Sequence, residues 1–458
     1  MFLNINSIEK TAEKYRTSPA HLNFETKKMN TPKLSNYFSQ KSPSAIRMAQ
    51  MEFAKRNDGT KAINVSIGNV SLPMHPAMQK RMFELNNPDS PLKDGVVKYT
   101  QTVGNQETID AFLNIVKSSG FPTENLFCQI TDGGSQAMEL VLLGVSDAND
   151  RPILLIDPAY TNYMSFAQRV GRKTITITRN LQDDGTFTLP SKEIIEETIT
   201  QYNPSAIVVI PYDNPTGQYY TQEDMITIAK LSVEHNMRII SDEAYRELQY
   251  HHQKSTSIRG IDNTLVPGIE GRRISIESAS KVRNACGLRI GAIITDNAEF
   301  HQQAVAENTT ALCSSTIGQY IFGSLAHLNK EELQARYEQQ RTYYGSMLNT
   351  LTSAFKEVLP GIIVSSPDAS IYSVIDVKHI AKPDFDAKTF VLFCAQQGYT
   401  LIDNQKYTVL TSPMSGFYNN KENPGKTQMR ISFVESPEQM KLVPYIFAEL
   451  FKQYENTR

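Results

Sequence analysis

The fold of this chain is indicated by residues 278–291, which read SASKVRNACGLRIG and directly follow the apolar run Ile274-Ser275-Ile276. Lys281 therefore stands just after a predicted strand, with hydroxyl side chains before it and Arg289 eight residues after it. An amine beside a cation and hydroxyl donors suits a lysine that reacts with a phosphorylated carbonyl cofactor. A single lysine in a polar loop is more often a solvated surface residue, so the assignment depends on the segments upstream.

The composition is that of an ordinary globular protein. The chain has 458 residues, of which 40% are hydrophobic and 21% are charged, and its formal net charge is −2. This length suits two or three domains and a large core. A nearly neutral chain without a long block of one charge sign argues against nucleic acid or an anionic membrane as the main partner.

The cysteines and the start of the chain predict a cytoplasmic protein. The four cysteines are widely spaced, without a CxxC pair or a cysteine–histidine cluster, so we expect thiols in a reducing compartment and no metal site. The first residues, MFLNINSIEK, lack a basic segment followed by a long apolar one. No stretch of the sequence approaches the ~18 apolar residues that a membrane helix needs.

The middle of the chain alternates between short apolar runs and helical patterns. Strands are expected at 63–67, 153–156, 207–210, 237–240, 274–276 and 292–294, and helices at 44–54, 137–145 and 221–235. Such alternation predicts a mostly parallel sheet that is covered on both faces. A long helical pattern at 300–352 precedes an α+β tail, with strands at 371–377 and 429–433 and helices at 385–397 and 437–453. Residues 1–42 form a polar extension, expected to be partly helical at 8–15.

Four further polar segments stand at the ends of predicted strands or at the start of a helix. They are Asp213-Asn214-Pro215-Thr216-Gly217, Ser241-Asp242-Glu243-Ala244-Tyr245, Thr131-Asp132-Gly133-Gly134-Ser135-Gln136 and Asp157-Pro158-Ala159-Tyr160-Thr161-Asn162-Tyr163. The spacing is 28 residues from Asn214 to Asp242, 39 more to Lys281 and eight more to Arg289. In this order and at these spacings, residues 43–458 resemble the class I/II aminotransferases of fold type I, which use pyridoxal 5′-phosphate (PLP).

The resemblance implies a fold and a division into domains. The fold would be α/β, with a mostly parallel, seven-stranded type of sheet sandwiched by helices in a large PLP-binding domain at 76–334. Residues 43–75 and 335–458 would form a smaller α+β domain, and residues 1–42 an N-terminal extension whose role is open. The resemblance also implies a homodimer with shared active sites, in which Tyr99 reaches the phosphate of the neighbouring subunit. The alternative for Tyr99 is a local core tyrosine.

The resemblance assigns catalytic roles to Lys281, Asp242 and Tyr245. Lys281 would form the aldimine with the cofactor aldehyde, and its freed amine would then act as general acid and base. Asp242 would pair with the pyridine nitrogen, while Asn214 and Tyr245 would hydrogen-bond the 3-oxygen of the ring. A helix cap is the alternative for Asp242, and a plain turn is the alternative for residues 214–217.

The resemblance also assigns residues to the cofactor's phosphate and ring face. The donors to the phosphate would be the start of the helix at Gly134, Ser135 and Gln136, the hydroxyl groups of Ser135 and Ser278, and the guanidinium of Arg289. Ser280 is a further hydroxyl that could instead only shape the loop. Tyr160 would stack on the cofactor ring, although Tyr163 could exchange roles with it.

On the substrate side, the resemblance points to Arg430, Gly68 and Asn214. Arg430 would bind the α-carboxylate with its fork of donors, with a surface salt bridge as the alternative. Gly68 would close over the substrate with its backbone. Two segments depart from the family pattern: residues 69–73 read NVSLP in place of a Pro-Asp-Phe segment, and residues 367–372 read PDASIY in place of a glycine-rich stretch. Both line the substrate side, so the amino acid and the 2-oxo acid stay open.

The resulting prediction is an aminotransferase that exchanges an amino group between an L-amino acid and a 2-oxo acid by a ping-pong mechanism. The same fold hosts other reactions, and the alternatives are a C–S β-lyase or an enzyme like aminocyclopropane-carboxylate synthase. A third interpretation is a non-catalytic regulator that senses PLP. The N-terminal extension is too short for the DNA-binding domain of such a regulator and is not strongly basic.

Overall fold

The computed structural model describes residues 32–41, 43–251, 254–419 and 423–457. The helix expected at 8–15 lies outside these residues. The chain divides into two units, residues 1–43 and residues 44–458. In the first unit, the short helix α1 spans Asn36–Ser39, and the side chain of Ser35 caps it. Every helix in the described ranges falls short of the length or the apolar character that a membrane crossing demands.

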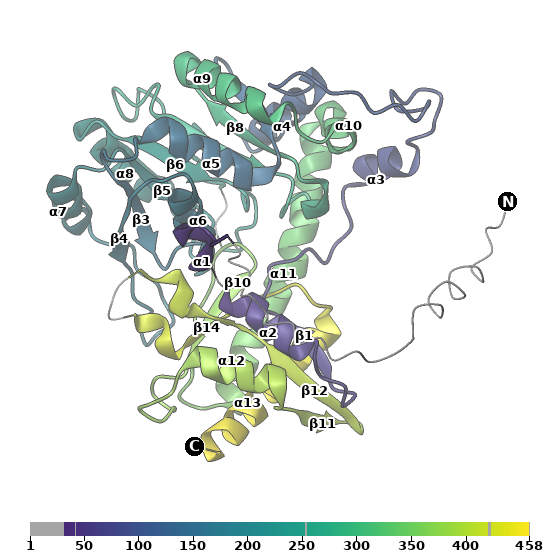
Figure 1. Cartoon of the computed structure of the whole chain (residues 1–458), viewed down its shortest axis with the longest axis vertical. Coiled ribbons are helices and arrows are strands. Elements are labelled where there is room, and N and C mark those ends of the chain that lie inside the picture. Colours follow the sequence, from purple (N-terminus) through teal and green to yellow (C-terminus); the bar gives the residue numbers. More distant parts are fainter. Residues whose placement is uncertain (1–31, 42, 252–253, 420–422, 458) are drawn as a thin grey trace, which may run out of the picture. The chain divides into compact units, whose positions relative to one another are not determined.

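The second unit contains both helices and strands, labelled in Figure 1 where there is room. Its α-helices are α2 (Ala45–Phe53), α3 (Pro76–Phe83), α4 (Gln106–Ser118), α5 (Gly133–Val145), α6 (Asn162–Arg169), α7 (Lys192–Tyr202), α8 (Gln222–Glu234), α9 (Ala298–Asn308), α10 (Thr316–Gly323), α11 (Lys330–Val358), α12 (Ala387–Gln396) and α13 (Pro437–Asn456). Its strands are β1 (Lys61–Asn64), β2 (Phe127–Thr131), β3 (Ile153–Asp157), β4 (Thr174–Thr178), β5 (Ala206–Val209), β6 (Arg238–Asp242), β7 (Arg273–Ser278), β8 (Gly291–Thr295), β9 (Ile363–Val364), β10 (Tyr372–Asp376), β11 (Thr400–Ile402), β12 (Gln405–Leu410), β13 (Ser412–Pro413) and β14 (Gln428–Ser432).

The largest sheet has seven strands in the order β2-β8-β7-β6-β5-β3-β4. Strand β8 is antiparallel to both of its neighbours, whereas the pairs β7–β6, β6–β5, β5–β3 and β3–β4 are parallel. The predicted fold class, a mostly parallel seven-stranded sheet, is therefore confirmed. Parallel strands end at a common edge, so Asp157, Asp242 and Ser278, which close β3, β6 and β7, are brought to that edge.

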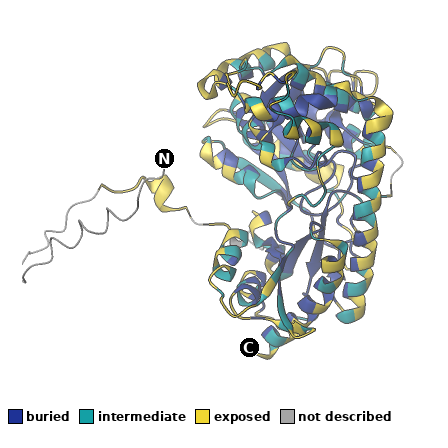
Figure 2. Ribbon diagram, turned by 90° about the vertical axis from the view of Figure 1, so that its right-hand side faces the viewer, coloured by how far each residue is buried: buried dark blue, intermediate teal, exposed yellow. Residues whose placement is uncertain are grey.

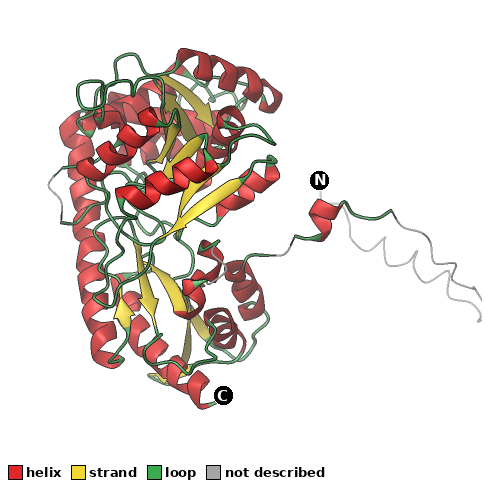
Figure 3. Cartoon of the chain, turned by 90° about the vertical axis from the view of Figure 1, so that its left-hand side faces the viewer, coloured by secondary structure: helices red, strands yellow, loops and turns green. Residues whose placement is uncertain are grey.

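Helices cover both faces of this sheet, which explains why its strands read as continuous apolar runs. Successive side chains of a strand point to opposite faces. Leu155 accordingly packs in one core cluster with residues of α5, α6 and α9, while Leu154 and Ile156 pack in another with residues of α7 and α8. Figure 2 shows the buried strands between helices whose outer sides are exposed, and Figure 3 shows the same layers by secondary structure.

Of the other two sheets, the one that contains β1 joins the N-terminal part of the second unit to the C-terminal third of the chain. One has the order β13-β14-β10-β9 and the other β1-β12-β11, in which β1 and β12 are parallel. A core cluster of residues from β1, α11, α12 and α13 fills the space around them. The long helix α11 continues through the predicted boundary at 334/335 (Figure 1). The division into 43–75 with 335–458 and 76–334 stays a prediction.

Two expected elements differ from the structure. The strand predicted at 63–67 ends at Asn64, because the Asn64 Oδ1 accepts hydrogen bonds from the backbone N–H and the hydroxyl of Ser66, at 3.2 and 2.6 Å, and turns the chain. The helical pattern at 300–352 is divided among α9, α10 and α11. Ser315 and Asn329 start the second and third of these helices as N-caps.

Candidate active site

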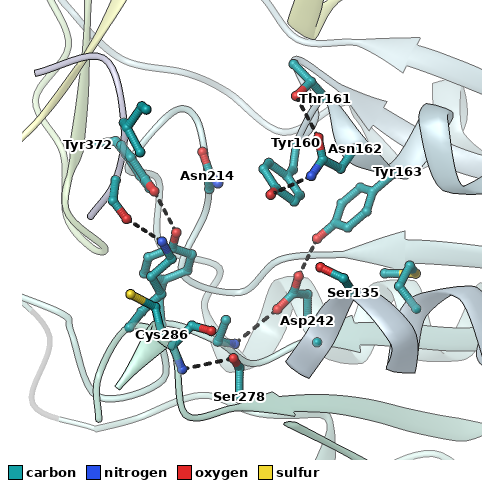
Figure 4. A pocket seen from close by; sticks show the side chains of 18 of the residues that line it. Ser135, Tyr160, Thr161, Asn162, Tyr163, Asn214, Asp242, Ser278, Cys286 and Tyr372 are labelled. Atoms are coloured by element: carbon teal, nitrogen blue, oxygen red, sulfur yellow. Dashed lines mark hydrogen bonds between the residues drawn. The ribbon is translucent and has the colours of Figure 1, made fainter. Parts of the chain in front are cut away.

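A cavity of about 340 Å³ lies at the carboxyl edge of the seven-stranded sheet and gathers most of the predicted site residues. These residues are Gly68, Gly134, Ser135, Tyr160, Asn214, Asp242, Tyr245, Ser278, Lys281, Arg289 and Arg430. They come from both ends of the sequence, since β14 carries Arg430 and the loop after β1 carries Gly68. Figure 4 shows how the side chains around this cavity lie.

Two predicted site residues do not line the cavity. Gln136 lies in the first turn of α5, but its side chain turns back, accepting from the backbone N–H of Asp132 at 2.7 Å and donating to Asn308 at 3.1 Å. The resemblance assigned the backbone N–H group of Gln136 to the phosphate, and this remains a prediction. The side chain of Gln136 stabilises the start of the helix through these two hydrogen bonds. Tyr99 is 79% exposed on the surface of the chain. Its predicted role toward a neighbouring subunit therefore stays a prediction.

Lys281 is held in a turn directly after β7. The Ser278 hydroxyl accepts a hydrogen bond from the backbone N–H of Ser280 at 3.0 Å, which ends the strand and aims the next side chain into the cavity. The Lys281 Nζ donates to the carbonyl oxygen of Gly68. This contact places the amine between the loop after β7 and the loop after β1.

Asp242 is the last residue of β6, and its carboxyl group faces the cavity. Its Oδ2 accepts a hydrogen bond from the Tyr163 hydroxyl at 2.6 Å, and its Oδ1 accepts from the backbone N–H of Ala244 at 3.1 Å (Figure 4). Burial raises the pKa of the Asp242 carboxyl, while the Tyr163 hydrogen bond and the charge of Lys281 act in the opposite direction. Among the described residues, no basic side chain lies within 4.0 Å of this carboxyl, so it lacks a cation.

The start of α5 and Arg289 form a concave group of donors, which we call the anion cradle. A Cβ on Gly133 (φ 73°) would lie 2.5 Å from the Arg289 Nη2, and a Cβ on Gly291 would lie 2.4 Å from the Gly133 carbonyl carbon. Residues without side chains thus let the guanidinium approach the first turn of the helix. Free N–H groups of a helix start, a guanidinium and the Ser135 and Ser278 hydroxyls suit a phosphate-sized anion.

Arg430 is 4% exposed and is held on the cavity wall by neutral groups. Its Nη1 donates to the Asn214 Oδ1 and its Nη2 to the Ser66 carbonyl oxygen, both at 2.8 Å. The guanidinium lies 4.3 Å from the ring centre of Tyr372 and 5.0 Å from that of Phe417. In the described part of the chain, its Nε has no partner and no carboxylate lies within 4.0 Å. A buried cation without a counter-ion suits a site for a ligand carboxylate.

Three tyrosines of the cavity wall were left open or missed in the sequence analysis, namely Tyr160, Tyr163 and Tyr372. The rings of Tyr160 and Tyr163 meet edge to face, with their centres 5.5 Å apart, and both line the cavity. Tyr163 is buried and its hydroxyl donates to Asp242, while Tyr160 is half-buried. Tyr372 was not predicted as a site residue. Its hydroxyl lies 2.7 Å from that of Tyr245, whose pKa is raised by burial. The sequence did contain one indication of this residue, because Tyr372 belongs to the segment PDASIY, which differs from the glycine-rich stretch of the family.

Comparisons with known proteins agree with this geometry. The family model described as aminotransferase class I and II matches residues 60–443. A probable kynurenine–oxoglutarate transaminase of Saccharomyces cerevisiae, BNA3, is 25% identical over 340 residues, which cover 72% of each chain. The crystal structure of that yeast protein has a TM-score of 0.76, with 21% identity and coverage of 92% of this chain and all of the other. The Thermus thermophilus aspartate aminotransferase with maleate has a TM-score of 0.75, with 20% identity and the same coverage.

The matched segment contains the seven-stranded sheet, the cavity at its edge and the residues that line it from Ser66 to Arg430. A family model that matches most of a chain identifies its family, whereas structural likeness at this identity shows the fold alone. This chain belongs to the class I and II aminotransferases, a family of enzymes that depend on PLP.

Proposed function

We propose that this enzyme transfers the amino group of an L-amino acid to a 2-oxo acid, with Lys281, Asp242 and Arg430 as its central residues. PLP supplies an aldehyde that takes up the amino group and a ring that accepts the electron pair left on the substrate's α-carbon. One observation carries the assignment of roles. The same cavity combines an amine, a carboxyl group without a cation, an anion cradle and a guanidinium without a carboxylate.

These residues fit the cofactor from end to end. The anion cradle of Gly134, Ser135, Ser278 and Arg289 would hold the phosphate. Asp242 would pair with the ring nitrogen and keep it protonated. The protonated nitrogen would then be the cation that the Asp242 carboxyl otherwise lacks. The remaining contacts would come from Tyr160 on the ring face, Asn214 and Tyr245 at the ring oxygen, and the Lys281 Nζ at the aldehyde carbon.

Proton transfer, orientation of the amine and binding of the substrate carboxylate would each fall to a different residue of the cavity. The Lys281 Nζ would take the proton from the substrate's α-carbon and deliver it to the former aldehyde carbon as general base and acid. The Gly68 carbonyl oxygen, which accepts a hydrogen bond from this amine, would orient it. Arg430 would bind the substrate α-carboxylate, and its bond to Asn214 would tie the carboxylate site to the cofactor site. The rings of Tyr372 and Phe417 exclude water from the guanidinium.

Replacement of Arg430 tests the carboxylate site. We expect Arg430→Ala to lower kcat/KM for amino acids about 30- to 1,000-fold, equal to about 2–4 kcal/mol, mainly through KM, because a charge-assisted bidentate contact is lost. Arg430→Lys keeps the charge without the fork and should fall between wild type and Arg430→Ala. Steady-state kinetics and the visible absorbance of bound PLP measure both effects. An unchanged KM with full PLP content would mean that the carboxylate is held elsewhere.

A half-reaction tests the transamination itself. An amino acid added to the PLP-loaded enzyme should replace the visible absorbance band by an ultraviolet one, and a 2-oxo acid should restore the visible band. Irreversible release of ammonia and pyruvate would instead favour a β-lyase. The names of the relatives mention kynurenine, aspartate and oxoglutarate for those proteins, so a screen of amino acids against several oxo acids should accompany the experiment.

The assembly is expected to be a cytoplasmic homodimer. Val96, Val97 and Tyr99 form an exposed apolar segment that a second copy would cover, which would let Tyr99 reach the partner's phosphate site. The four unpaired cysteines suit a reducing compartment. We expect sedimentation velocity to give a dimer, and Tyr99→Ala to weaken PLP affinity about 10-fold through the loss of one hydrogen bond to a charged group. A fully active monomer would contradict both statements.

A further inference from the structure

The start of α2 forms part of the cavity wall, although no motif in the sequence connects this helix with the site. Ser44, Ile46 and Arg47 line the same cavity as Lys281 and Arg430. Helix α2 packs against α12 and against β13, and Ser412 of β13 is the register partner of Arg430 in β14. Helix α2 is therefore connected through β13 to the strand that carries the proposed α-carboxylate site.

The charges of the cavity leave Arg47 without an assigned function. The lining contains four basic residues, Arg47, Lys281, Arg289 and Arg430, and Asp242 is its one acidic residue in the described part of the chain. The proposed function uses Lys281, Arg289 and Asp242 for the cofactor and Arg430 for the α-carboxylate. Arg47 is the remaining cation, and it comes from α2, an element that supplies none of the proposed cofactor residues.

The guanidinium of Arg47 is available to a ligand. The residue is exposed, and its Nη1 donates to the Gln50 Oε1 of the same helix at 3.0 Å. Within the described residues, no carboxylate lies within 4.0 Å of it. Gln50 is a neutral partner one turn away, so it leaves the charge of Arg47 uncompensated. A planar fork of donors on a cavity wall suits a carboxylate, which it can bind through two parallel hydrogen bonds.

We propose that Arg47 binds the distal carboxylate of a dicarboxylic substrate, namely an L-amino acid with an acidic side chain and the corresponding 2-oxo acid. This inference rests on the proposed function, because it requires Arg430 to hold the α-carboxylate. Two arginines on connected elements then bind the two ends of one substrate. The absence of a further acidic residue from the described lining favours an anionic substrate side chain over a cationic one.

The test compares Arg47→Met with wild type and with Lys55→Met in the PLP-loaded enzyme. Lys55 lies two residues beyond the end of α2, is 67% exposed in its side chain and lies outside this cavity, so its replacement makes the same charge change away from the cavity lining. We expect Arg47→Met to lower the ratio of kcat/KM for L-glutamate to that for L-norleucine about 10- to 100-fold, as for the loss of a charged hydrogen bond. Lys55→Met should keep the wild-type ratio, and Arg47→Lys should give an intermediate one.

Equilibrium binding supplies a second readout that does not depend on turnover. By calorimetry, succinate should bind the wild-type enzyme at least about 10-fold more tightly than butyrate, and Arg47→Met should remove this preference. Equal binding of succinate and butyrate to wild type, or equal losses in Arg47→Met and Lys55→Met, would overturn the inference. Wild-type transamination of neutral but not of acidic amino acids would overturn it and leave the proposed function intact. Failure to transaminate any amino acid would overturn both.

Discussion

Lys281→Ala is expected to lower the transamination rate by at least about 10⁴-fold, because one amine supplies both the covalent link to PLP and the proton transfer. The structure places this amine against the Gly68 carbonyl oxygen, inside the cavity that gathers the proposed cofactor and carboxylate sites. No other lysine lines that cavity within the described residues. The variant should also lack the visible absorbance that PLP acquires when a lysine binds its aldehyde.

The matched control is Lys230→Ala, which removes an exposed lysine from the outer surface of α8. It should keep wild-type rates and absorbance. A Lys281→Ala enzyme that retains the wild-type visible band would contradict the assignment, because another amine would then hold the cofactor. Addition of a small primary amine such as methylamine should restore a fraction of the activity of Lys281→Ala, which a purely structural defect would not allow.

Asp242→Asn has the second largest expected effect, a loss of about 10²- to 10³-fold in kcat. A carboxylate beside the ring nitrogen raises the pKa of that nitrogen by about 1–3 units, so its loss would leave most rings unprotonated and less able to accept electrons. Asparagine keeps the size and the hydrogen bond from the Ala244 N–H, so the fold should be retained. Pre-steady-state rates of the half-reaction measure the loss directly.

Two further measurements separate the charge of Asp242 from its packing. Tyr163→Phe removes the 2.6 Å hydrogen bond and keeps the carboxylate, so it should lower the rate only about 10-fold. A PLP analogue methylated on the ring nitrogen carries a permanent positive charge and should partly restore Asp242→Asn. Wild-type rates in Asp242→Asn would contradict the pairing. A failure of the analogue to raise the rate would assign the loss to packing.

Residues that directly follow parallel strands could be predicted from the sequence. Asp242 and Lys281 each stand at or just beyond the end of a short apolar run, and parallel strands bring such ends to one edge. The start of α5 could be predicted from a different pattern, because Gly133-Gly134-Ser135 opens the apolar helical run that begins at Ala137. Local patterns placed these residues at the ends of elements, and the resemblance to a known family assigned them to the cofactor half of the cavity.

The substrate half could not be predicted in the same way. Arg47 and Tyr372 reach the cavity through packing of α2 on β13 and through antiparallel pairing of β10 with β14, contacts between segments that are distant in sequence. Tyr160 and Tyr163 are three residues apart in one segment, and the sequence did not reveal that the hydroxyl of Tyr163 bonds Asp242, a contact between residues 79 positions apart. The Gln136 side chain turns back to the Asp132 N–H, a local hydrogen bond that competes with any contact to a ligand.

The central claim is that Lys281 binds PLP at the carboxyl edge of the sheet. Borohydride reduction of the PLP-loaded enzyme, followed by protease digestion and mass spectrometry, tests it most directly, because reduction makes the link between lysine and cofactor permanent. We predict a single phosphopyridoxyl modification, on the peptide that contains Lys281. A modification on any other lysine, or an unmodified Lys281 in enzyme that has taken up PLP, would contradict this assignment.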